Sequence, residues 1–550
     1  MILTPTLRST APSALAWGGF VATFSGVIGG SFARLVSMPA ERAGFKTMLA
    51  GMSAQTTAVL PPVRDAGTLG GYAWWFLFGF MPLTLGAWAL LAGTAASRGD
   101  DERGLLEQWI GAAVPRWRIV VEQTTAFAVA AGGALILISI PLVVASQVSG
   151  AGLSLGGLAL QCVNALAMLL VLYGLGALAG HLLPTRRVAT GTAALVSLAL
   201  FLLNGFGRTL HWLDGARWIS PFYYWDRSDP MVPGGAMVYP ALGALTGILV
   251  VLIALSVWAF TRRDLRDVPF RVMTAWRTRT VLRIQSSNPL LRSPALAGLW
   301  SQRTGIVIWG IGIGLYAGLD ISIVKPMVAV FRSPHAGVLS MQGKLVFGFG
   351  KADPYAGFIG QGWFPVACLL LGVHAATQVS RWASDDTEGR LEMTLAASVS
   401  RTRVITQRLS TLLAASLVLV AANHVAVLIA AASQGISLDG GRLLQSSALV
   451  LPFAMACGGA GAAVAAWRPR IAIGVLIALL LGSYLLTLMA GPMFAPNLPP
   501  DWFMNLSVFK LYGVPLTDGP YWGGLWATLA IAVAGFAAAV LALNRRDVGR

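Results

Sequence analysis

Apolar residues occur in twelve long runs along the chain, separated by shorter polar segments. Each run supplies about 20 residues of low charge, the length that a helix needs to cross the hydrocarbon core of a bilayer. Apolar residues are continuous within a run rather than alternating with polar ones, which favours helices over the strands of a membrane barrel. The pattern therefore predicts an all-α polytopic membrane protein with twelve transmembrane helices. They are expected near residues 14–33, 72–96, 119–146, 157–182, 188–207, 237–260, 304–324, 357–379, 404–433, 443–466, 471–492 and 521–543.

One charged segment occurs twice. Residues 100–118 read DDERGLLEQWIGAAVPRWR and residues 385–403 read DDTEGRLEMTLAASVSRTR, with nine of nineteen positions identical at a constant offset of 285. Ordinary composition would give roughly one or two matches. In the second span of each half, Gly79 and Pro82 match Gly362 and Pro365 at an offset of 283. A repeat of this length predicts that the chain contains two copies of one unit.

The duplication predicts two tandem six-helix repeats of the same orientation, because six spans return the chain to the starting side. The first repeat is expected over residues 1–266 and the second over 304–550, with a cytoplasmic amphipathic connecting segment, 267–303, between them. An axis along the membrane normal would relate the repeats around a central pathway. The offset between the two copies changes from 283 to 285 just after Ser97-Arg98. We expect a turn there to accommodate the two additional residues of the second copy. Pro82 and Pro365 are expected to kink their helices, either as ordinary kinks or as paired bends lining the pathway.

Composition agrees with a membrane protein and predicts its orientation. The 550 residues are 56% hydrophobic and only 11% charged, whereas soluble domains carry about 25% charged residues. The net charge of +17 is better explained by topology than by a nucleic-acid partner, since 26 of the 39 lysines and arginines fall on one side of the twelve-span arrangement. The positive-inside rule makes that side cytoplasmic, so both termini of this multi-pass cell-membrane protein are expected inside.

On this topology the repeated charged segment lies in the cytoplasm, between the second and third spans of each repeat. Leu105, Leu106, Trp109 and Ile110 fall on one face of a short predicted helix. Asp100-Asp101-Glu102 are expected in its first turn, where acidic residues stabilise the positive end of the helix dipole. A solvated loop is the simpler interpretation of a single copy. Two copies with the same spacing instead favour a pair of docking helices for a symmetric partner.

The repeated segment resembles the coupling-helix region of type 2 ABC exporter permeases. That region often reads E-x-x-x-G-T-L-E, followed by a short apolar run and P-V-S-R. Residues 389–392 (GRLE) and 399–401 (VSR) fit closely, whereas the first copy departs at Leu105 and at 114–116 (VPR). Residues 220–224 (SPFYY) are similar to the family's outer-loop motif. A single chain with two six-span copies resembles the permeases of polyketide-antibiotic (tetronasin-type) and multidrug efflux exporters of actinobacteria.

The resemblance implies two copies of a separate ATPase subunit, which would bind ATP and Mg²⁺, while this chain binds no cofactor of its own. The sequence has no G-x-x-x-x-G-K-[ST] phosphate loop, so ATP hydrolysis is expected on the partner. Gly104 and Gly389 would allow the partner to approach closely. The expected contact residues on the two coupling helices are Asp100, Asp101, Glu102, Gly104, Glu107, Arg116, Asp385, Asp386, Glu388, Gly389, Glu392 and Arg401.

The resemblance also implies that the second and fifth spans of each half line the substrate pathway. Few charges lie in these spans, which suits hydrophobic or amphipathic compounds such as antibiotics, drugs or lipids. For any one of these residues, packing or lipid contact is the simpler interpretation. The candidate pathway residues are Trp75, Phe78, Pro82, Trp88, Phe201, Asn204, Trp363, Phe364, Pro365, Tyr484 and Met489.

An ion-coupled secondary multidrug transporter with twelve spans is the main alternative. Ion coupling usually needs carboxylates inside the membrane, and only Glu122 and Asp320 of the 22 acidic residues fall inside predicted spans, both near span ends. A membrane enzyme is the third class considered. The sequence contains neither a metal-spaced His/Cys cluster nor a nucleophile with its base, so no catalytic or metal site is predicted.

Overall fold

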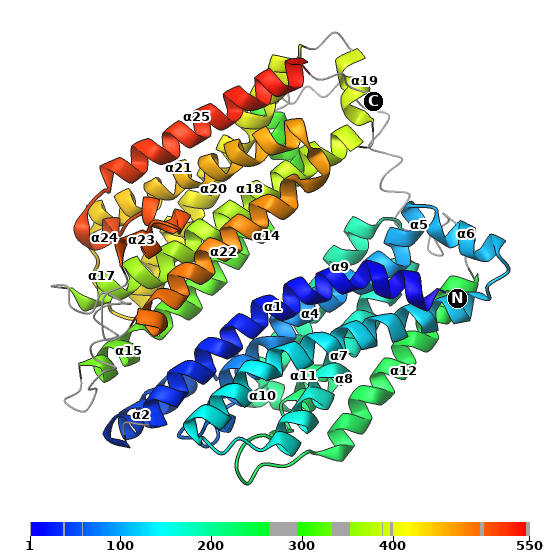
Figure 1. Cartoon of the computed structure of the whole chain (residues 1–550), viewed down its shortest axis with the longest axis vertical. Helices are drawn as coiled ribbons and strands as arrows, with labels where there is room; N and C mark the ends of the chain where they lie inside the picture. The colour runs from blue at the N-terminus through cyan, green and yellow to red at the C-terminus, as the bar shows by residue number, and fades with distance from the viewer. Residues whose placement is uncertain are drawn as a thin grey trace. The chain divides into compact units, whose positions relative to one another are not determined.

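The computed structural model describes residues 2–36, 39–57, 59–262, 294–332, 353–387, 389–396, 400–494 and 500–545. Across these residues the regular structure is helical, and no strand occurs among them (Figure 1). The chain divides into two compact units, Met1–Ile284 and Gln285–Arg550. Most of the predicted connecting segment lies outside the described residues. Its last part, from Pro294, belongs to the same helix as the expected seventh span.

In unit 1 the central helix is α8 (Leu155–Leu182), which packs against α4, α7, α9 and α12, while α1 packs along α7. Small residues allow the helices to approach closely. A Cβ atom on Gly93 of α4 would lie 2.2 Å from the carbonyl oxygen of Tyr173 in α8. The helices of unit 1 are α1 (Leu3–Val36), α2 (Pro39–Gln55), α3 (Leu69–Ala73), η1 (Trp74–Phe78), α4 (Gly79–Thr94), η2 (Ala95–Gly99), α5 (Asp100–Glu102), α6 (Leu105–Gly111), α7 (Arg116–Ser149), α8, α9 (Arg186–Gly207), α10 (His211–Asp214), η3 (Arg217–Ile219), α11 (Pro221–Trp225) and α12 (Tyr239–Arg262).

In unit 2 the corresponding central helix is α21 (Gly440–Trp467), which packs against α18, α20, α22 and α25, while α14 packs along α20. A Cβ atom on Gly459 of α21 would lie 2.7 Å from the carbonyl oxygen of Ala532 in α25. The helices of unit 2 are α14 (Pro294–Ser322), α15 (Val324–Phe331), α17 (Pro354–Phe358), η6 (Ile359–Trp363), α18 (Phe364–Thr387), α19 (Arg390–Ala396), α20 (Arg401–Ser433), α21, α22 (Pro469–Phe494), α23 (Asp501–Met504), η7 (Val508–Leu511), α24 (Pro515–Asp518) and α25 (Trp522–Arg545).

Eleven helices in the described parts of the chain are long and apolar enough to cross a membrane. They coincide with eleven of the twelve predicted spans, so the chain is a multi-pass helical membrane protein. The remaining predicted span, 471–492, lies in α22, where the apolar stretch Ile471–Thr487 is shorter than the others. The twelfth span therefore stays a prediction.

The second span of each unit contains a π-helical turn shortly before its mid-span proline. These turns, η1 and η6, lie 285 residues apart, as do the two charged segments. Each precedes a mid-span proline, Pro82 or Pro365, whose ring nitrogen has no hydrogen to donate to the preceding turn. Prolines and π turns are the usual causes of local helix distortion. Both units thus carry the same irregularity in the same helix.

The turn expected just after Ser97-Arg98 is absent, and that prediction is wrong. In unit 1 the helix continues from α4 through the π-helical η2 into α5, and in unit 2 α18 continues to Thr387. The helix is therefore continuous, in both units, across the point where the offset changes from 283 to 285. The π turn in unit 1 changes the angular position of the side chains around the helix axis at that point.

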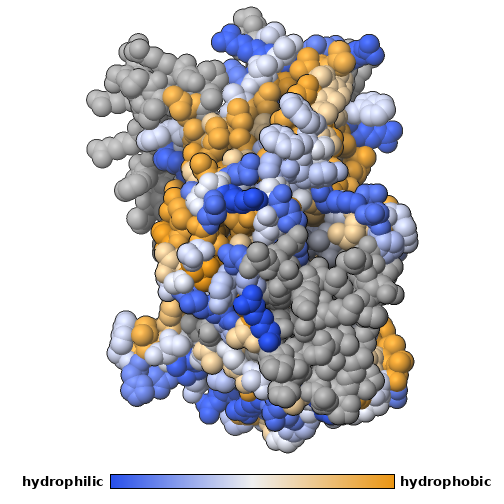
Figure 2. Space-filling model, turned by 90° about the vertical axis from the view of Figure 1, so that its left-hand side faces the viewer, coloured by the Kyte–Doolittle hydropathy of each residue, from blue (hydrophilic) through white to orange (hydrophobic). Residues whose placement is uncertain are grey.

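Large apolar side chains are exposed along the outer faces of the spanning helices. Ile136 is 67% exposed, Val148 81% and Ile429 65%. Figure 2 shows such hydrophobic surface beside patches of hydrophilic residues. In a soluble protein, extended exposed apolar surface marks an interaction site. On helices of this length it is the surface that lipid covers.

Candidate functional site

The short helix α6 begins after a glycine that the backbone requires. Gly104 has a φ of 74° and Gly389, which precedes α19, has a φ of 73°. This left-handed conformation strains residues with a Cβ atom. No atom lies within 4 Å of where a Cβ would be on either glycine. Within the chain, therefore, these glycines serve the sharp turn between the second span and the short helix.

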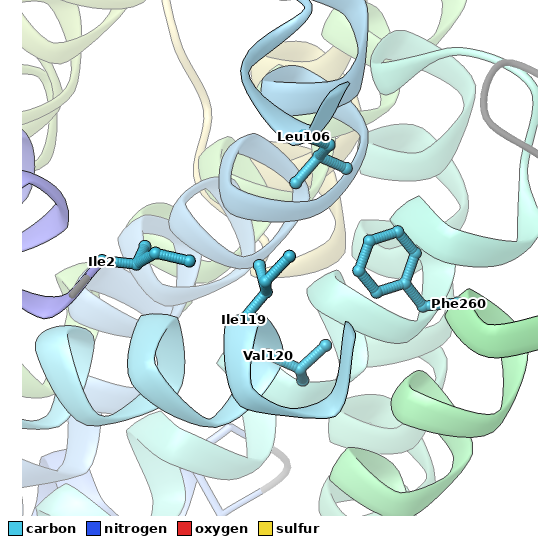
Figure 3. Close-up of a cluster of buried hydrophobic side chains, with 5 residues drawn as sticks. All are labelled: Ile2, Leu106, Ile119, Val120 and Phe260. Atoms are coloured by element: carbon cyan, nitrogen blue, oxygen red, sulfur yellow. The ribbon is translucent and has the colours of Figure 1, made fainter. Parts of the chain in front are cut away.

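Leu106 anchors α6 to its unit. Its side chain is fully buried in a cluster with Ile2, Ile119, Val120 and Phe260, which come from the N-terminal segment, α7 and α12 (Figure 3). Trp109 and Ile110 pack against the same cluster. The apolar face predicted from the sequence is thus the face that docks, and the opposite face carries the exposed Glu107 and Gln108.

The second unit has the same anchor at the equivalent position. Leu391 of α19 is 3% exposed. It lines a small pocket together with Ile405 and Leu543, which stand 285 and 283 residues after Val120 and Phe260. Leucine is smaller than phenylalanine, so Leu543 fills less of this space than Phe260 does in unit 1. The exposed face of α19 carries Glu392 and Met393, the latter 68% exposed.

An arginine that follows each short helix binds the end of the last spanning helix of its unit, α12 or α25. Arg116 donates from Nη1 to the carbonyl oxygen of Phe260 at 2.7 Å, and Arg401 donates to that of Leu543 at 2.5 Å. The next carbonyl in each helix, Thr261 or Asn544, accepts a second, longer bond. A cation at a helix C-terminus interacts favourably with the helix dipole and with carbonyls that lack intrahelical partners. Arg116 and Arg401 are therefore bound within the chain.

The sequence had predicted the paired aspartates in the first turn of the short helix, and that prediction is wrong. They lie instead at the end of the second span. Asp100 and Asp101 are 7% and 2% exposed. Asp101 pairs with Arg98 at 2.7 Å, and Asp100 pairs with Arg103 at 2.5 Å. Gln123 of α7 also donates to Asp100. The left-handed turn at Gly104 separates these residues from α6, so their carboxylates stabilise the loop from inside.

The second unit arranges its acidic pair more loosely. Asp385 accepts from Arg390 at 2.9 Å and from Arg408 of α20 at 3.5 Å, and its side chain is 38% exposed. Asp386 is half-buried. In unit 1, Glu102 is exposed, but its carboxylate accepts the backbone N–H of Arg186 at the start of α9. Glu388 lies outside the described residues.

The described side chains predicted to line the pathway are buried or half-buried within their own units. Trp75, Phe78, Trp363 and Phe364 are at most 1% exposed. Three indoles donate hydrogen bonds that hold them in place: Trp75 to the Pro61 carbonyl, Trp88 to the Ser13 hydroxyl and Trp363 to the Asn423 side chain.

The remaining predicted pathway residues also make internal contacts. Phe201 packs on Phe222, Asn204 donates to Asp226, and Tyr484 packs on Phe509. Pro82 is buried and Pro365 half-buried. The side chain of Met489 lies outside those described. In this conformation the described members of the set pack helices together, and the sequence could not reveal this because burial depends on neighbouring helices.

The sequence reasoning missed a pocket at the opposite end of unit 1 from α6. It is a cavity of about 580 Å³ between the segment before α3 and the segment between α9 and α12. We call it the arginine pocket, because its charged lining consists of Arg64, Arg208, Arg217, Arg227, Asp226 and Asp229.

Two ion pairs shape the arginine pocket, and one of them is buried on both sides. Arg208 pairs with Asp226 at 2.5 Å, with both side chains largely buried, and Arg64 pairs with Asp229. Burial raises the pKa of the Asp226 carboxyl, while the neighbouring Arg208 opposes that rise. A sequence signal did exist. Residues 208–229 carry six charges, whereas the equivalent segment of the second half, 493–520, carries three.

The described residues contain no group of three or more His, Cys, Asp or Glu side chains that could hold a metal ion. Glu122, one of the two acidic residues predicted inside a span, accepts the backbone N–H groups of Ile2 and Leu3 and pairs with Arg118. Its carboxylate therefore binds the N-terminal segment to α7.

Comparison with known proteins agrees with the membrane architecture. No curated protein matches the chain. Residues 291–544, which make up most of unit 2, match the family model described as the C-terminal domain of the multidrug efflux system permease Rv1217c. The chain is thus a multi-pass helical membrane protein whose second unit is similar to the C-terminal domain of a multidrug efflux permease.

Proposed function

We propose that this chain is the permease subunit of an ATP-driven exporter of the polyketide-antibiotic and multidrug type. It would move hydrophobic or amphipathic compounds out of the cell. The observation that carries the proposal is the pair of short helices, α6 and α19. Each is held by a buried leucine at the same position and followed by an arginine bound to the end of the sixth helix.

The contacts of α6 would allow a displacement of this short helix to be transmitted to the spanning helices α7 and α12. Leu106 touches residues of α7 and α12 in one cluster, and Arg116, at the start of α7, holds the end of α12. A force on the exposed face of α6 would therefore act on two spanning helices at once. Packed interiors transmit such displacements because they deform little. Glu107, and Glu392 in unit 2, are the exposed carboxylates that we propose for contact with the partner.

The buried acidic residues take a different part in this proposal. Asp100 and Asp101 hold the loop that leads to α6, because both carboxylates are engaged with neighbouring arginines inside the unit. We therefore propose them as positioning residues, together with Arg116 and Arg401. Glu102, Asp385 and Asp386 are more accessible and remain proposed contacts.

Twelve spans in two tandem six-helix repeats are part of the proposal. The matched π turns, the matched anchors and the central position of α8 and α21 support it. In unit 1 the N-terminal segment and the end of α12 meet α6 in one cluster, and in unit 2 the end of α25 lies at the start of α20. If α6 and α19 face the cytoplasm, both termini do so as well.

Two copies of a separate ATPase subunit, carrying ATP and Mg²⁺, complete the proposed exporter. Co-purification from the native membrane, with mass spectrometry of bound soluble proteins, tests this directly. Recovery of an ATPase, and ATP hydrolysis that requires it, are the expected results. Robust hydrolysis by the purified chain alone would contradict the division of labour.

Asp320 favours a second candidate function, ion-coupled transport. It lies in the spanning helix α14, and its Oδ2 atom is buried without a hydrogen-bond partner in the described structure. Intramembrane carboxylates commonly serve ion coupling. Replacement of Asp320 by Asn distinguishes the two functions. ATP-driven transport should survive the change, whereas transport driven by an ion gradient should be lost.

A further inference from the structure

The arginine pocket has more positive than negative charge in its lining. Four arginines and two aspartates line it, which leaves an excess of two positive charges. The aspartates are already paired, Asp226 with Arg208 and Asp229 with Arg64. The two remaining guanidinium groups belong to Arg217 and Arg227.

Arg217 and Arg227 both lie against one aromatic ring, that of Tyr223. Each guanidinium carbon lies 5.2 Å from the ring centroid of Tyr223. Arg227 donates to the Tyr223 hydroxyl at 2.9 Å, is exposed, and has no carboxylate partner among the described residues. Arg217 pairs with Asp214, an exposed residue outside the lining, at 3.1 Å. Both guanidinium groups thus keep donors for an incoming anion.

The rest of the lining is apolar or backbone. Trp74, Pro61 and Pro62 contribute apolar surface, and Trp74 is held by a hydrogen bond from its indole to the Ser228 carbonyl. Gly235 also lines the pocket, and a Cβ atom there would lie 2.2 Å from the carbonyl oxygen of Asp229. A larger residue at position 235 would therefore collide with the backbone of this turn.

We infer that the arginine pocket binds the carboxylate or phosphate group of an amphipathic organic anion. Guanidinium groups suit these anions because their N–H donors match two oxygens at once. A volume of about 580 Å³ is far larger than an inorganic ion needs and lies in the range of small-molecule sites. The apolar walls would take the hydrophobic part of the same molecule.

The inferred site belongs to unit 1 alone. The positions equivalent to Asn204 and Arg208, 283 residues later, are Thr487 and Gly491, and the position equivalent to Asp226, 287 residues later, is Gly513. The second half therefore lacks the residues that build the Arg208–Asp226 ion pair. Such a site would make the two halves of the chain differ in the ligands that they recognise.

Binding of a fluorescent acid, 1-pyrenebutyrate, and of its neutral methyl ester to the purified full-length chain in nonionic detergent tests the inference. Fluorescence anisotropy reports each affinity without ATP or any partner, so the result is independent of the proposed transport function. We expect the acid to bind at least about tenfold more tightly than the ester. Arg227→Gln should lower the affinity for the acid by about tenfold, and Arg227→Lys should lower it less.

Lys510→Gln is the matched control, because Lys510 is the cation of the equivalent outer segment in unit 2 and should not affect binding. Thermal unfolding midpoints confirm that the variants are folded. Equal affinity for acid and ester, or unchanged affinity in Arg227→Gln, would overturn the inference.

Competition then identifies the source of the anion. Displacement by phosphatidylglycerol but not phosphatidylcholine indicates a lipid headgroup, and displacement by neither indicates a free organic acid.

Discussion

The side chain of Arg116 donates a hydrogen bond to the backbone carbonyl of Phe260 across 144 positions of sequence. Arg401 makes the same bond to Leu543 in the second unit. Arg116 stands at the start of the third span, shortly after α6, and Phe260 stands near the end of the sixth. One side chain thus links the segment proposed to receive force with the end of a spanning helix.

Replacement of Arg116 by Ala should loosen this link. The end of α12 would lose a charge-assisted hydrogen bond, and its carbonyls would lose a nearby cation, a cost of about 1–2 kcal/mol. We expect a lower thermal unfolding midpoint of the purified chain and a reduced transport rate. The same should hold for Arg401→Ala. Arg403→Ala, an exposed neighbour, is the control and should change neither quantity. If Arg116→Ala and Arg401→Ala unfold at the same temperature as the Arg403→Ala control, the link contributes nothing to the stability of the chain.

Replacement of Glu107 and Glu392 together by Arg should uncouple ATP hydrolysis from transport. Both side chains are exposed, so expression and thermal stability should remain close to those of the natural chain. Reversed charge would disfavour docking of the same partner surface. Transport into vesicles and ATPase activity of the reconstituted complex measure the effect.

The matched control for this pair is Asp501→Arg, a charge reversal at an exposed side chain at the start of α23 in unit 2. It should leave coupling intact. Transport that persists unchanged in the double variant would sink the assignment of α6 and α19 as docking helices.

Truncation of Leu106 to Ala should release α6 from its unit. The side chain is fully buried, and such truncations cost about 2–5 kcal/mol. Much of that cost should appear as local opening, since α6 has seven residues and depends on this anchor. Hydrogen exchange of residues 105–111 should therefore accelerate. Leu105→Ala, at a half-buried neighbour, should have a smaller effect. Unaltered exchange in Leu106→Ala would mean that other contacts hold the helix.

Addition of one methyl group at Gly93 should disturb the packing of α4 on α8. Its Cβ would lie 2.2 Å from the Tyr173 carbonyl oxygen, so the helices must separate. Overpacking of this kind costs about 1–3 kcal/mol, and we expect a lower unfolding midpoint for Gly93→Ala. Gly191→Ala in α9 is the control, because no atom lies within 4 Å of its added Cβ. There alanine should be neutral or stabilising, given its better helix propensity. A tolerated Gly93→Ala would contradict the close approach.

Hydrophobic runs and the repeated charged segment are properties of the sequence, and they determined the main features of this protein. Eleven of the predicted spans coincide with helices because a run of about 20 apolar residues has one favourable conformation in lipid. The apolar face of α6 was also predictable, since the spacing of Leu105, Leu106, Trp109 and Ile110 places them together on a helix.

Only the tertiary structure decided which charges face inward. Asp101 and Glu107 look alike in the sequence, but Arg98 folds back onto Asp101 and buries it, while Glu107 stays exposed on the other side of a left-handed turn. The same holds for the arginine pocket, where Arg64 meets Asp229 across 165 positions. Burial and ion pairing depend on which distant segments come into contact, and local periodicity carries no information about such contacts.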